Sequence, residues 1–275
     1  MNTSPILVLG ATGKTGRRVM DRLTAAGHAV RSGSRSATPP FDWDRPDTWA
    51  PALDGVGALF ISFFPDLAVP SAPAAIERLT ACATEAGVRR IVLLSGRGEA
   101  NAERCEEIVR ASGVSTTIVR ASWFAQNFDE GVLLDPVLAG TIALPGGSVR
   151  EPFVDVDDIA DVAVAALMDE RHAGQIYEVT GPRLLSFDEA AATIGKAAGR
   201  PVHYADITAD EYRAALTEHA GPEFAGMLTD LMTEVLDGRN EWLGDGVQNA
   251  LDREPRDFAD YAAATAATGA WSADR

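Results

Sequence analysis

Residues 6–16 read ILVLGATGKTG, and this stretch decides the fold. An apolar run, Ile6–Leu9, has the length and composition of a buried strand, and glycines at positions 10, 13 and 16 follow it directly. A glycine-rich turn between a strand and a helix is typical of proteins that bind nucleotide phosphates. Two turns of this kind have to be distinguished, because one serves nucleoside triphosphates and the other serves dinucleotides.

The spacing of the glycines argues against a triphosphate loop. That loop needs G-x-x-x-x-G-K-[ST], so Gly13 and Lys14 would require a glycine at position 8, where Val8 stands. The later apolar runs also end in LFIS and VLLS, without the aspartate that holds magnesium in triphosphatases. The sequence therefore disfavours ATP.

The same glycines fit the dinucleotide turn. Gly10 permits the tight bend, Gly13 lets the backbone approach a pyrophosphate, and Gly16 lets the helix pack closely on the sheet. The N–H groups at the start of that helix then face the phosphates. The residues of the turn expected to bind the cofactor are Gly10, Thr12, Gly13, Lys14, Thr15 and Gly16.

The end of the second expected strand indicates which dinucleotide binds. NAD-binding proteins usually place Asp or Glu there, whereas residues 30–36 read VRSGSRS, with two arginines and no acid. A charge-assisted hydrogen bond to a 2′-phosphate contributes about 1.5–3 kcal/mol, which is roughly a tenfold to hundredfold preference. We therefore expect NADP(H) to be favoured over NAD(H), with Arg35 and Ser36 as its recognition residues. The alternative is that Arg35 is an ordinary solvated surface arginine.

Strand and helix signals alternate along the first half of the chain. Strands are expected at 6–9, 28–33, 58–62, 90–95 and 115–120, and helices from the glycine turn to about 26, at 72–86 and at 103–111. This alternation predicts right-handed crossovers and a doubly wound parallel sheet of the α/β class. After about residue 130 the rhythm changes, with strands at 141–144 and 176–179 and helices at 157–168 and 187–198. We place the first domain at 1–150 and a smaller, closely joined α/β part at 151–275.

Composition excludes several classes of protein. The chain of 275 residues has a formal net charge of −16, which argues against a nucleic-acid partner. Its four histidines show no metal-ligand spacing, and no apolar run approaches the roughly 18 residues of a membrane helix. The N-terminus lacks the pattern of a secretory signal, and the two cysteines fit a reducing cytoplasm. A small-molecule substrate is the expected partner, and the oligomeric state, including a homodimer, stays open.

Several stretches resemble the NmrA-like group of atypical short-chain dehydrogenases. They are ILVLGATGKTGRRV, SRS (34–36), GVRRIVLLS, ASGVSTTIVRASWFAQNF and REPRDFADYAAATAATGAW. Within that group, TGKT, SWFAQNF, PFVDVDDIADVA and GPRLLSFDEAA are most similar to the agroclavine and festuclavine dehydrogenases of ergot-alkaloid synthesis. The resemblance covers nearly the whole chain and implies a Rossmann core, with the C-terminal part covering the nicotinamide and the substrate.

The resemblance also implies roles for two loops and a pocket. The loop Ser62, Phe63, Phe64 and the segment from Ser95 to Arg97 would lie against the nicotinamide half of the cofactor. The pocket residues that the resemblance implies are Trp123, Phe124 and Asn127. Without the resemblance, the aromatic residues among them would read equally well as part of the core.

The usual acid–base pair of short-chain dehydrogenases, Tyr-x-x-x-Lys, is missing from its expected place. The tyrosines all lie later in the chain, the only lysines are Lys14 and Lys196, and residues 96–107 read GRGEANAERCEE. A positioned acid is worth about 10²–10⁴ in rate, so a neutral ketone would need a substitute. An iminium ion needs no proton when it accepts a hydride. Quinones and conjugated carbonyls depend less on a positioned acid than a neutral ketone does.

Three residues are candidates for a substitute role. Ser95 lies at a strand end, where its hydroxyl would orient an acceptor or make a turn hydrogen bond. Glu99 would act as an acid if burial raised its pKa, and is otherwise an exposed carboxylate at a helix start. Arg97 would bind an anionic substrate.

We therefore expect an NADP(H)-dependent oxidoreductase acting on an imine or iminium, an activated carbonyl or a quinone. The alternative is a non-catalytic NAD(P) sensor of the NmrA type.

Overall fold

The computed structural model describes residues 4–272, and these form two compact units. The first unit contains residues 4–121, 156–179 and 245–253. The second contains residues 122–155, 180–244 and 254–272. The sequence placed a single boundary near residue 150, whereas the structure assigns the helix and strand of 156–179 to the first unit. Residues 156–179 belong to the first unit because their helix packs on its sheet and their strand pairs with a strand of that sheet.

The first unit is built on a six-stranded sheet in which every pairing is parallel. Its strands, in spatial order, are β2 (Val30–Gly33), β1 (Ile6–Leu9), β3 (Ala58–Ile61), β4 (Arg90–Gly96), β5 (Ser115–Ala121) and β8 (Ile176–Val179). The chain moves outward from β1 in one direction to β2 and in the other to β3. The carboxyl ends of β1 and β3 therefore flank the switch point, where doubly wound sheets bind their ligands.

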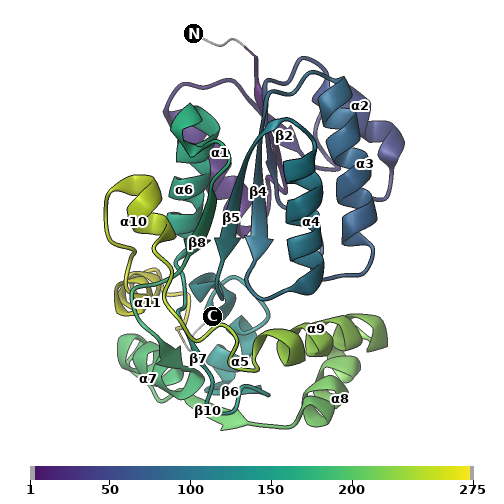
Figure 1. Cartoon of the computed structure of the whole chain (residues 1–275). Helices are drawn as coiled ribbons and strands as arrows, with labels where there is room; N and C mark the ends of the chain where they lie inside the picture. Colours follow the sequence, from purple (N-terminus) through teal and green to yellow (C-terminus); the bar gives the residue numbers. More distant parts are fainter. Residues whose placement is uncertain (1–3, 273–275) are drawn as a thin grey trace. The chain divides into compact units, whose positions relative to one another are not determined.

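Helices cover both faces of this sheet (Figure 1). One face carries α1 (Lys14–Ala25), α6 (Val156–Met168) and α10 (Gly246–Leu251). The other carries α2 (Trp49–Leu53), α3 (Ala72–Glu85) and α4 (Ala100–Ala111), and a short 3₁₀ turn at Pro46–Thr48 precedes α2. All four residues of β1, and all four of β3, are buried, as expected for strands covered on both faces. The predicted doubly wound α/β fold is confirmed.

Ion pairs join the helices of one face. The guanidinium of Arg22 on α1 lies 2.6 Å from Asp157 Oδ1 and 2.6 Å from Asp161 Oδ1 on α6. Arg253, just after α10, lies 2.6 Å from Asp158 Oδ1 and 2.7 Å from Asp161 Oδ2. Three aspartates on α6 thus pair with these two arginines.

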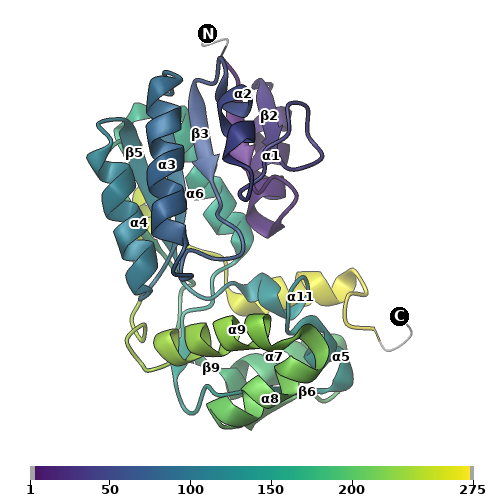
Figure 2. The ribbon, with the colours of Figure 1, turned by 90° about the vertical axis from the view of Figure 1, so that its right-hand side faces the viewer.

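The second unit combines short strands with helices (Figure 2). β6 (Thr141–Leu144) pairs in parallel with β10 (His203–Asp206), and β7 (Arg150–Glu151) pairs antiparallel with β9 (Leu185–Ser186). The helices are α5 (Leu134–Ala139), α7 (Phe187–Ala198), α8 (Ala209–Ala220), α9 (Pro222–Val235) and α11 (Phe258–Ala267). Short 3₁₀ turns occur at Ala125–Phe128 in this unit and at Glu170–His172 in the first. The core of the second unit is aromatic: the side chains of four residues are almost wholly buried, namely Phe128, Phe153, Phe187 and Trp271.

Local signals placed most of these elements correctly. The strands at 6–9, 141–144 and 176–179 match the expected bounds, and the other predicted elements differ by up to three residues at an end. Ser186 and Glu189 form a capping box at the start of α7. Cys82 and Cys105 are both free thiols. Among the described residues, no helix is long and apolar enough to cross a membrane.

Candidate functional site

The turn after β1 has the geometry of a phosphate cradle. Gly10 has φ = +68°, a conformation that residues with a side chain rarely adopt, and its carbonyl accepts a hydrogen bond of 2.9 Å from the N–H of Gly13. Helix α1 then starts at Lys14, with Gly13 as an extended N-cap residue and no side-chain cap. Its first turn contains no acidic residue. No side chain therefore caps this end of the 12-residue helix, and the N–H groups at a helix start are suited to bind an anion.

Gly16 holds this cradle together by having no side chain. A Cβ atom at this position would lie 2.1 Å from the carbonyl oxygen of Gly10. At Gly10 a Cβ atom would lie 3.1 Å from Cβ of Ser62, the first residue after β3. The roles expected for both glycines, a tight bend and close packing, therefore have a direct steric basis. The second contact also shows that the loop after β3 lies against the glycine turn.

Strand β2 carries one arginine that bonds within the structure, and the loop after β2 carries another that is exposed. Arg31 donates two hydrogen bonds of 2.7 Å to the carbonyl oxygens of Ala52 and Asp54. Arg35 and Ser36 are exposed, and within residues 4–272 the Arg35 guanidinium has no ion-pair partner. Of the two arginines between residues 30 and 36, only Arg35 is thus exposed.

An aromatic cluster supports the loops after β2 and β3, and the sequence reasoning missed it. Phe41 stacks on Trp49 with ring centroids 6.0 Å apart, and Trp43 lies 5.0 Å from Phe41 and 4.6 Å from Phe63. The two tryptophans, six residues apart in an otherwise polar stretch, were the available signal. Phe63 is therefore anchored, whereas its neighbour Phe64 is 72% exposed.

Ser95 belongs to a buried network at the carboxyl ends of β4, β5 and β8. Its hydroxyl donates a hydrogen bond of 2.6 Å to Oε1 of Glu106 on α4. Glu106 also accepts hydrogen bonds from Nε and Nη2 of Arg120, and Nη1 of Arg120 donates a bond of 2.6 Å to Glu178. Because the single hydroxyl hydrogen of Ser95 is directed to Glu106, this hydroxyl can accept a hydrogen bond but has no further proton to donate.

Arg97 extends the same network. Its guanidinium is buried, and Nε lies 3.0 Å from Oε2 of Glu178. Two arginines and two glutamates thus alternate beside the strand ends, so each buried charge has a partner of opposite sign. Spacing alone did not reveal Glu106, Arg120 and Glu178 as members of one network, because they come from three separate segments.

Glu99 is buried, unlike the exposed carboxylate that its position at a helix start suggested. It is the N-cap residue of α4, but its side chain does not cap the helix. The carboxyl group instead lies beside Gly96, where an added Cβ atom would lie 1.9 Å from its Oε1. Burial raises the pKa of the Asp66 carboxyl. The burial that an acidic role of Glu99 would require is therefore present.

The pocket residues implied by the resemblance lie in the second unit. Trp123 and Phe124 are half-buried, and the Trp123 ring meets Phe187 edge to face at 5.2 Å. Asn127 is also half-buried, in the 3₁₀ turn that follows. Phe128, by contrast, is completely buried against Phe153 and belongs to the core. Phe128 is thus a core residue, whereas Trp123 and Phe124 each keep part of their surface exposed.

Three of the four tyrosines make side-chain hydrogen bonds within their own unit. Tyr177 lies 2.7 Å from Nδ1 of His172, and burial raises the Tyr177 pKa and lowers that of His172. Tyr204 donates to the Leu144 carbonyl at 3.2 Å, and Tyr261 donates to Asp129 at 2.6 Å. Helix α4, the helix after β4, reads ANAERCEEIVRA and carries neither a tyrosine nor a lysine.

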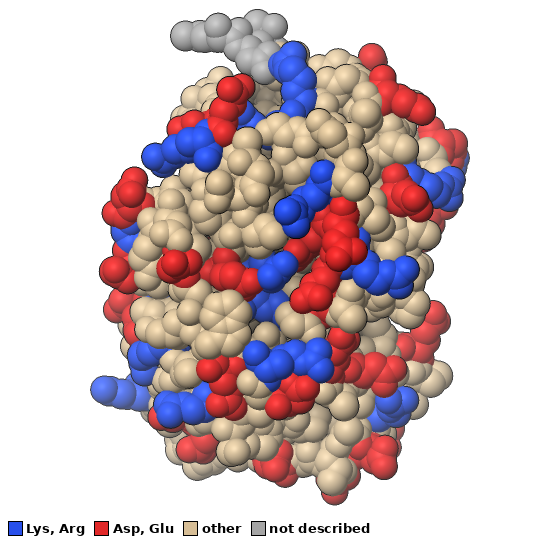
Figure 3. Space-filling model, in the orientation of Figure 1, with Lys and Arg blue, Asp and Glu red and all other residues tan. Residues whose placement is uncertain are grey.

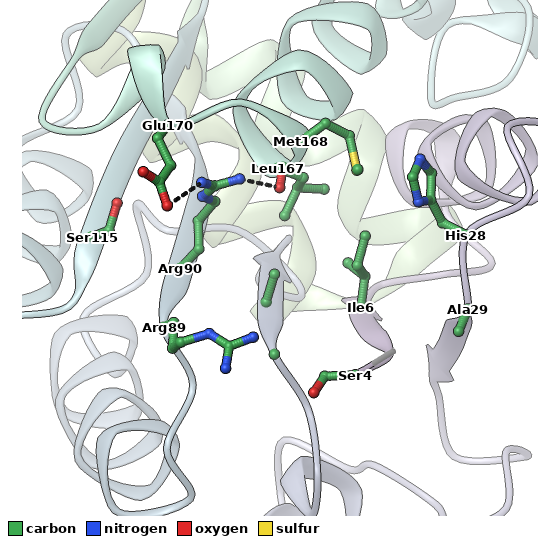
Figure 4. A pocket seen from close by; sticks show the side chains of 12 residues that line it. Ser4, Ile6, His28, Ala29, Arg89, Arg90, Ser115, Leu167, Met168 and Glu170 are labelled. Atoms are coloured by element: carbon green, nitrogen blue, oxygen red, sulfur yellow. Dashed lines mark hydrogen bonds and ion pairs between the residues drawn. The ribbon is translucent and has the colours of Figure 1, made fainter. Parts of the chain in front are cut away.

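One cavity of about 450 Å³ lies at the amino ends of the strands, at the end of the sheet opposite the glycine turn (Figure 4). It is lined by residues from the amino ends of the strands, including Ile6 and Arg90. The guanidinium of Arg90 bonds the Leu167 carbonyl at 2.5 Å, and it lies 3.8 Å from Glu170. Because the glycine turn is at the carboxyl ends, this cavity is not the dinucleotide site.

On the face drawn in Figure 3, acidic and basic side chains are interspersed. Among residues 4–272, no group of three or more His, Cys, Asp or Glu side chains could hold a metal ion. Three features of the first unit follow the carboxyl ends of its strands. They are the glycine cradle after β1, the exposed Arg35 after β2, and the loops after β3 and β4.

These features define an NAD(P)H-binding protein of the α/β class. A family model described as NAD(P)H-binding matches residues 10–170, from the first glycine of the turn through α6. The chain belongs to this family. The match includes every cofactor-binding residue that the sequence analysis named.

Known relatives cover nearly the full length of the chain. An NAD(P)H azoreductase from Xenophilus azovorans is 32% identical, and the alignment spans 95% of this chain and 98% of the relative. An agroclavine dehydrogenase from Claviceps fusiformis is 31% identical over 93% of this chain and 95% of the relative. A triphenylmethane reductase from Citrobacter sp., solved in complex with NADP(H), shares the fold with a TM-score of 0.76 at 20% identity, over 95% of this chain and 99% of that one. The predicted resemblance to clavine dehydrogenases and the prediction of an NAD(P)H-dependent oxidoreductase are confirmed.

Proposed function

We propose that this protein is an NADP(H)-dependent reductase of a small or medium organic acceptor, without a Tyr–Lys acid pair. The acceptor is an imine or iminium, an activated carbonyl or a quinone. When bound, the reduced cofactor supplies the hydride. The residues of this chain bind the cofactor, orient the acceptor and exclude water.

The observation that carries this proposal is the steric fit of the glycine cradle. Gly10 and Gly16 leave room where a Cβ atom would meet Ser62 or the Gly10 carbonyl oxygen. The uncapped start of α1 offers its amide groups and the positive end of the helix dipole to a pyrophosphate. Thr12, Lys14 and Thr15 would contact the same phosphates.

The proposed preference for NADP(H) rests on Arg35. Its guanidinium is exposed at the end of β2, beside Ser36, and the segment that follows the strand contains no carboxylate before Asp42. An arginine in this position can form charge-assisted hydrogen bonds to a 2′-phosphate. A phosphate-free ribose would gain nothing from the same guanidinium.

The acceptor class follows from what the carboxyl-end loops contain. Helix α4 supplies no tyrosine or lysine, and the Ser95 hydrogen is held by Glu106. Rate acceleration would then come mostly from proximity and orientation, which suffice for electron-poor acceptors. Trp123, Phe124 and Asn127 are proposed to line the acceptor pocket, and Phe63 and Phe64 to flank the nicotinamide.

The decisive experiment measures NADPH binding and NADPH oxidation separately. Titration calorimetry measures NADPH binding. NADPH oxidation is measured with a panel of acceptors: cyclic imines, N-alkyl iminium ions, quinones and conjugated carbonyls. We expect binding in the absence of acceptor and turnover with at least one class. Binding without turnover on any class would favour a dinucleotide sensor instead. Failure to bind either NADPH or NADH would refute the proposal.

The Arg35→Asp variant tests the recognition of the 2′-phosphate. Losing a charge-assisted hydrogen bond costs about 1.5–3 kcal/mol, so NADPH affinity should fall roughly tenfold to hundredfold while NADH affinity is kept. Arg45→Asp is the matched control, because Arg45 lies in the same connection but pairs with Asp47 at 2.7 Å. Equal selectivity in wild type and Arg35→Asp would show that the phosphate binds elsewhere.

A further inference from the structure

The cavity at the amino ends of the strands is separate from the dinucleotide cradle. The residues that line it all belong to the first unit. Its volume of about 450 Å³ lies within the range of roughly 300–1,000 Å³ that small-molecule pockets occupy. Ile6, which begins β1, lines the cavity, whereas Gly10 follows the other end of that strand. A small molecule held in this cavity would therefore leave the cradle accessible.

Backbone amide groups at this end of the sheet are already hydrogen-bonded. The N–H of Ile6 donates to the Ala29 carbonyl at 2.9 Å. The N–H of Gly57 donates to the Pro5 carbonyl at 2.9 Å, and the N–H of Arg89 donates to the Gly57 carbonyl at 3.1 Å. Each backbone N–H has a single hydrogen to donate. Recognition of a ligand in the cavity therefore falls mainly to side chains.

Two adjacent arginines line the cavity, and they differ in their contacts (Figure 4). The guanidinium of Arg90 donates to the Leu167 carbonyl at 2.5 Å and lies 3.8 Å from Oε1 of Glu170. Leu167 is in the last turn of α6, where a cation offsets the negative end of the helix dipole, so Arg90 stabilises the fold. Arg89 is exposed, and within residues 4–272 its guanidinium has neither an ion-pair partner nor a hydrogen-bond acceptor. Arg89 is therefore the arginine that can bind an anion.

Apolar side chains form another part of the lining. Ile6, Ala58 and Leu167 are buried and contribute to the cavity surface. Met168, the last residue of α6, also lines the cavity and is 41% exposed. A methionine side chain is flexible and polarisable, so it adapts to the shape of an apolar group. A ligand with an apolar part would cover surface of Met168 that is now in contact with water.

The charges around the cavity favour an anion with a single negative charge. Arg90 is already engaged, and the exposed carboxylate of Glu170, which also lines the cavity, would repel a second negative charge. A planar carboxylate matches the two-pronged donor geometry of one guanidinium. His28 and Ser115 line the cavity as well, and within the described part of the chain their side chains have no hydrogen-bond partner. These two side chains can supply further polar contacts.

We propose that this cavity is a second ligand site, which binds an organic monocarboxylate that carries a compact apolar group. The carboxylate pairs with the guanidinium of Arg89, and the apolar group packs against Met168 and Ile6. The monocarboxylate and the dinucleotide bind at the same time, because the two sites lie at opposite ends of the sheet. Binding at this site requires neither the cofactor nor the hydride acceptor.

The first test follows the binding of benzoate by NMR of protein labelled at the methionine methyl groups. The chain has five methionines, and Met168 lines the cavity, so its signal reports the site. We expect a saturable shift of the Met168 signal that is unchanged when NADPH is present. Benzamide keeps the ring without the charge, and acetate keeps the charge without the ring; each should bind at least about tenfold more weakly. The proposal is overturned if benzoate does not shift the Met168 signal, or if NADPH abolishes the shift.

The second test removes the cation. Arg89→Gln should weaken benzoate binding roughly tenfold or more, because a charge-assisted hydrogen bond is lost. Arg110→Gln is the matched control, since Arg110 is an exposed arginine of the same unit on α4 and does not line the cavity. Urea denaturation should show that both variants keep the stability of the wild type. Equal weakening in the two variants would indicate unspecific attraction and overturn the site, and tighter binding of phenyl phosphate than of benzoate would overturn the assignment of a monocarboxylate.

Discussion

Replacing Gly16 by alanine should damage both the stability of the protein and its affinity for NADPH. The added Cβ atom would lie 2.1 Å from the Gly10 carbonyl oxygen, and such contacts essentially never fall below 3.0 Å. The start of α1 and the bend at Gly10 must therefore separate by roughly 0.9 Å or more. Forcing extra atoms into a packed site typically costs about 1–3 kcal/mol.

The same displacement moves the amide groups that face the pyrophosphate. A hydrogen bond to a charged group is worth about 1.5–3 kcal/mol, so losing one should weaken NADPH binding roughly tenfold to hundredfold. Urea denaturation reports the change in stability, and titration calorimetry reports the change in affinity. The two losses should occur together, because one steric conflict causes both.

Two other glycines serve as matched controls for Gly16→Ala. A Cβ atom at Gly13 would lie 3.3 Å from the Gly10 oxygen, so Gly13→Ala should cost less stability than Gly16→Ala but should obstruct the approach of the pyrophosphate. At Gly226, on α9, the nearest atom would be 3.9 Å away, and alanine there should stabilise the helix by about 0.5–1 kcal/mol without affecting binding. Unchanged stability and unchanged NADPH affinity in Gly16→Ala would refute the assignment of the cradle.

Two further predictions concern charged groups. Glu106→Gln should destabilise the protein by about 3 kcal/mol in denaturant titrations, because a buried partner of Arg120 loses its charge; a change below 1 kcal/mol would show that Glu178 alone suffices. Asp257 caps α11 and pairs with Arg183 at 2.7 Å, and this arginine lowers the Asp257 pKa below its usual value. Its charge therefore stabilises the folded state above about pH 4, and the stabilisation is lost as the pH falls through the lower folded pKa. Asp257→Asn should be less stable than wild type at pH 7 by up to about 1 kcal/mol and equally stable near pH 2; a difference that persists at pH 2 would contradict this origin.

Local patterns in the sequence determined the fold class and the cofactor turn. The strand at 6–9, the glycines at 10, 13 and 16, and the helix after them are short-range features, and short-range sterics fix them. The capping box of Ser186 and Glu189 was readable for the same reason, because its hydrogen bonds span three residues. Hydrophobic periodicity supplied most of the remaining elements.

Only the tertiary structure decided which polar residues act together. Glu99 was readable as a helix start, but its burial beside Gly96 depends on how the loops after the strands pack. Likewise, Ser95 is joined to Glu106, Arg120 and Glu178 through the order of the strands. A single sequence records local propensity at each position, whereas the proximity of distant charged groups arises when a parallel sheet aligns the ends of its strands.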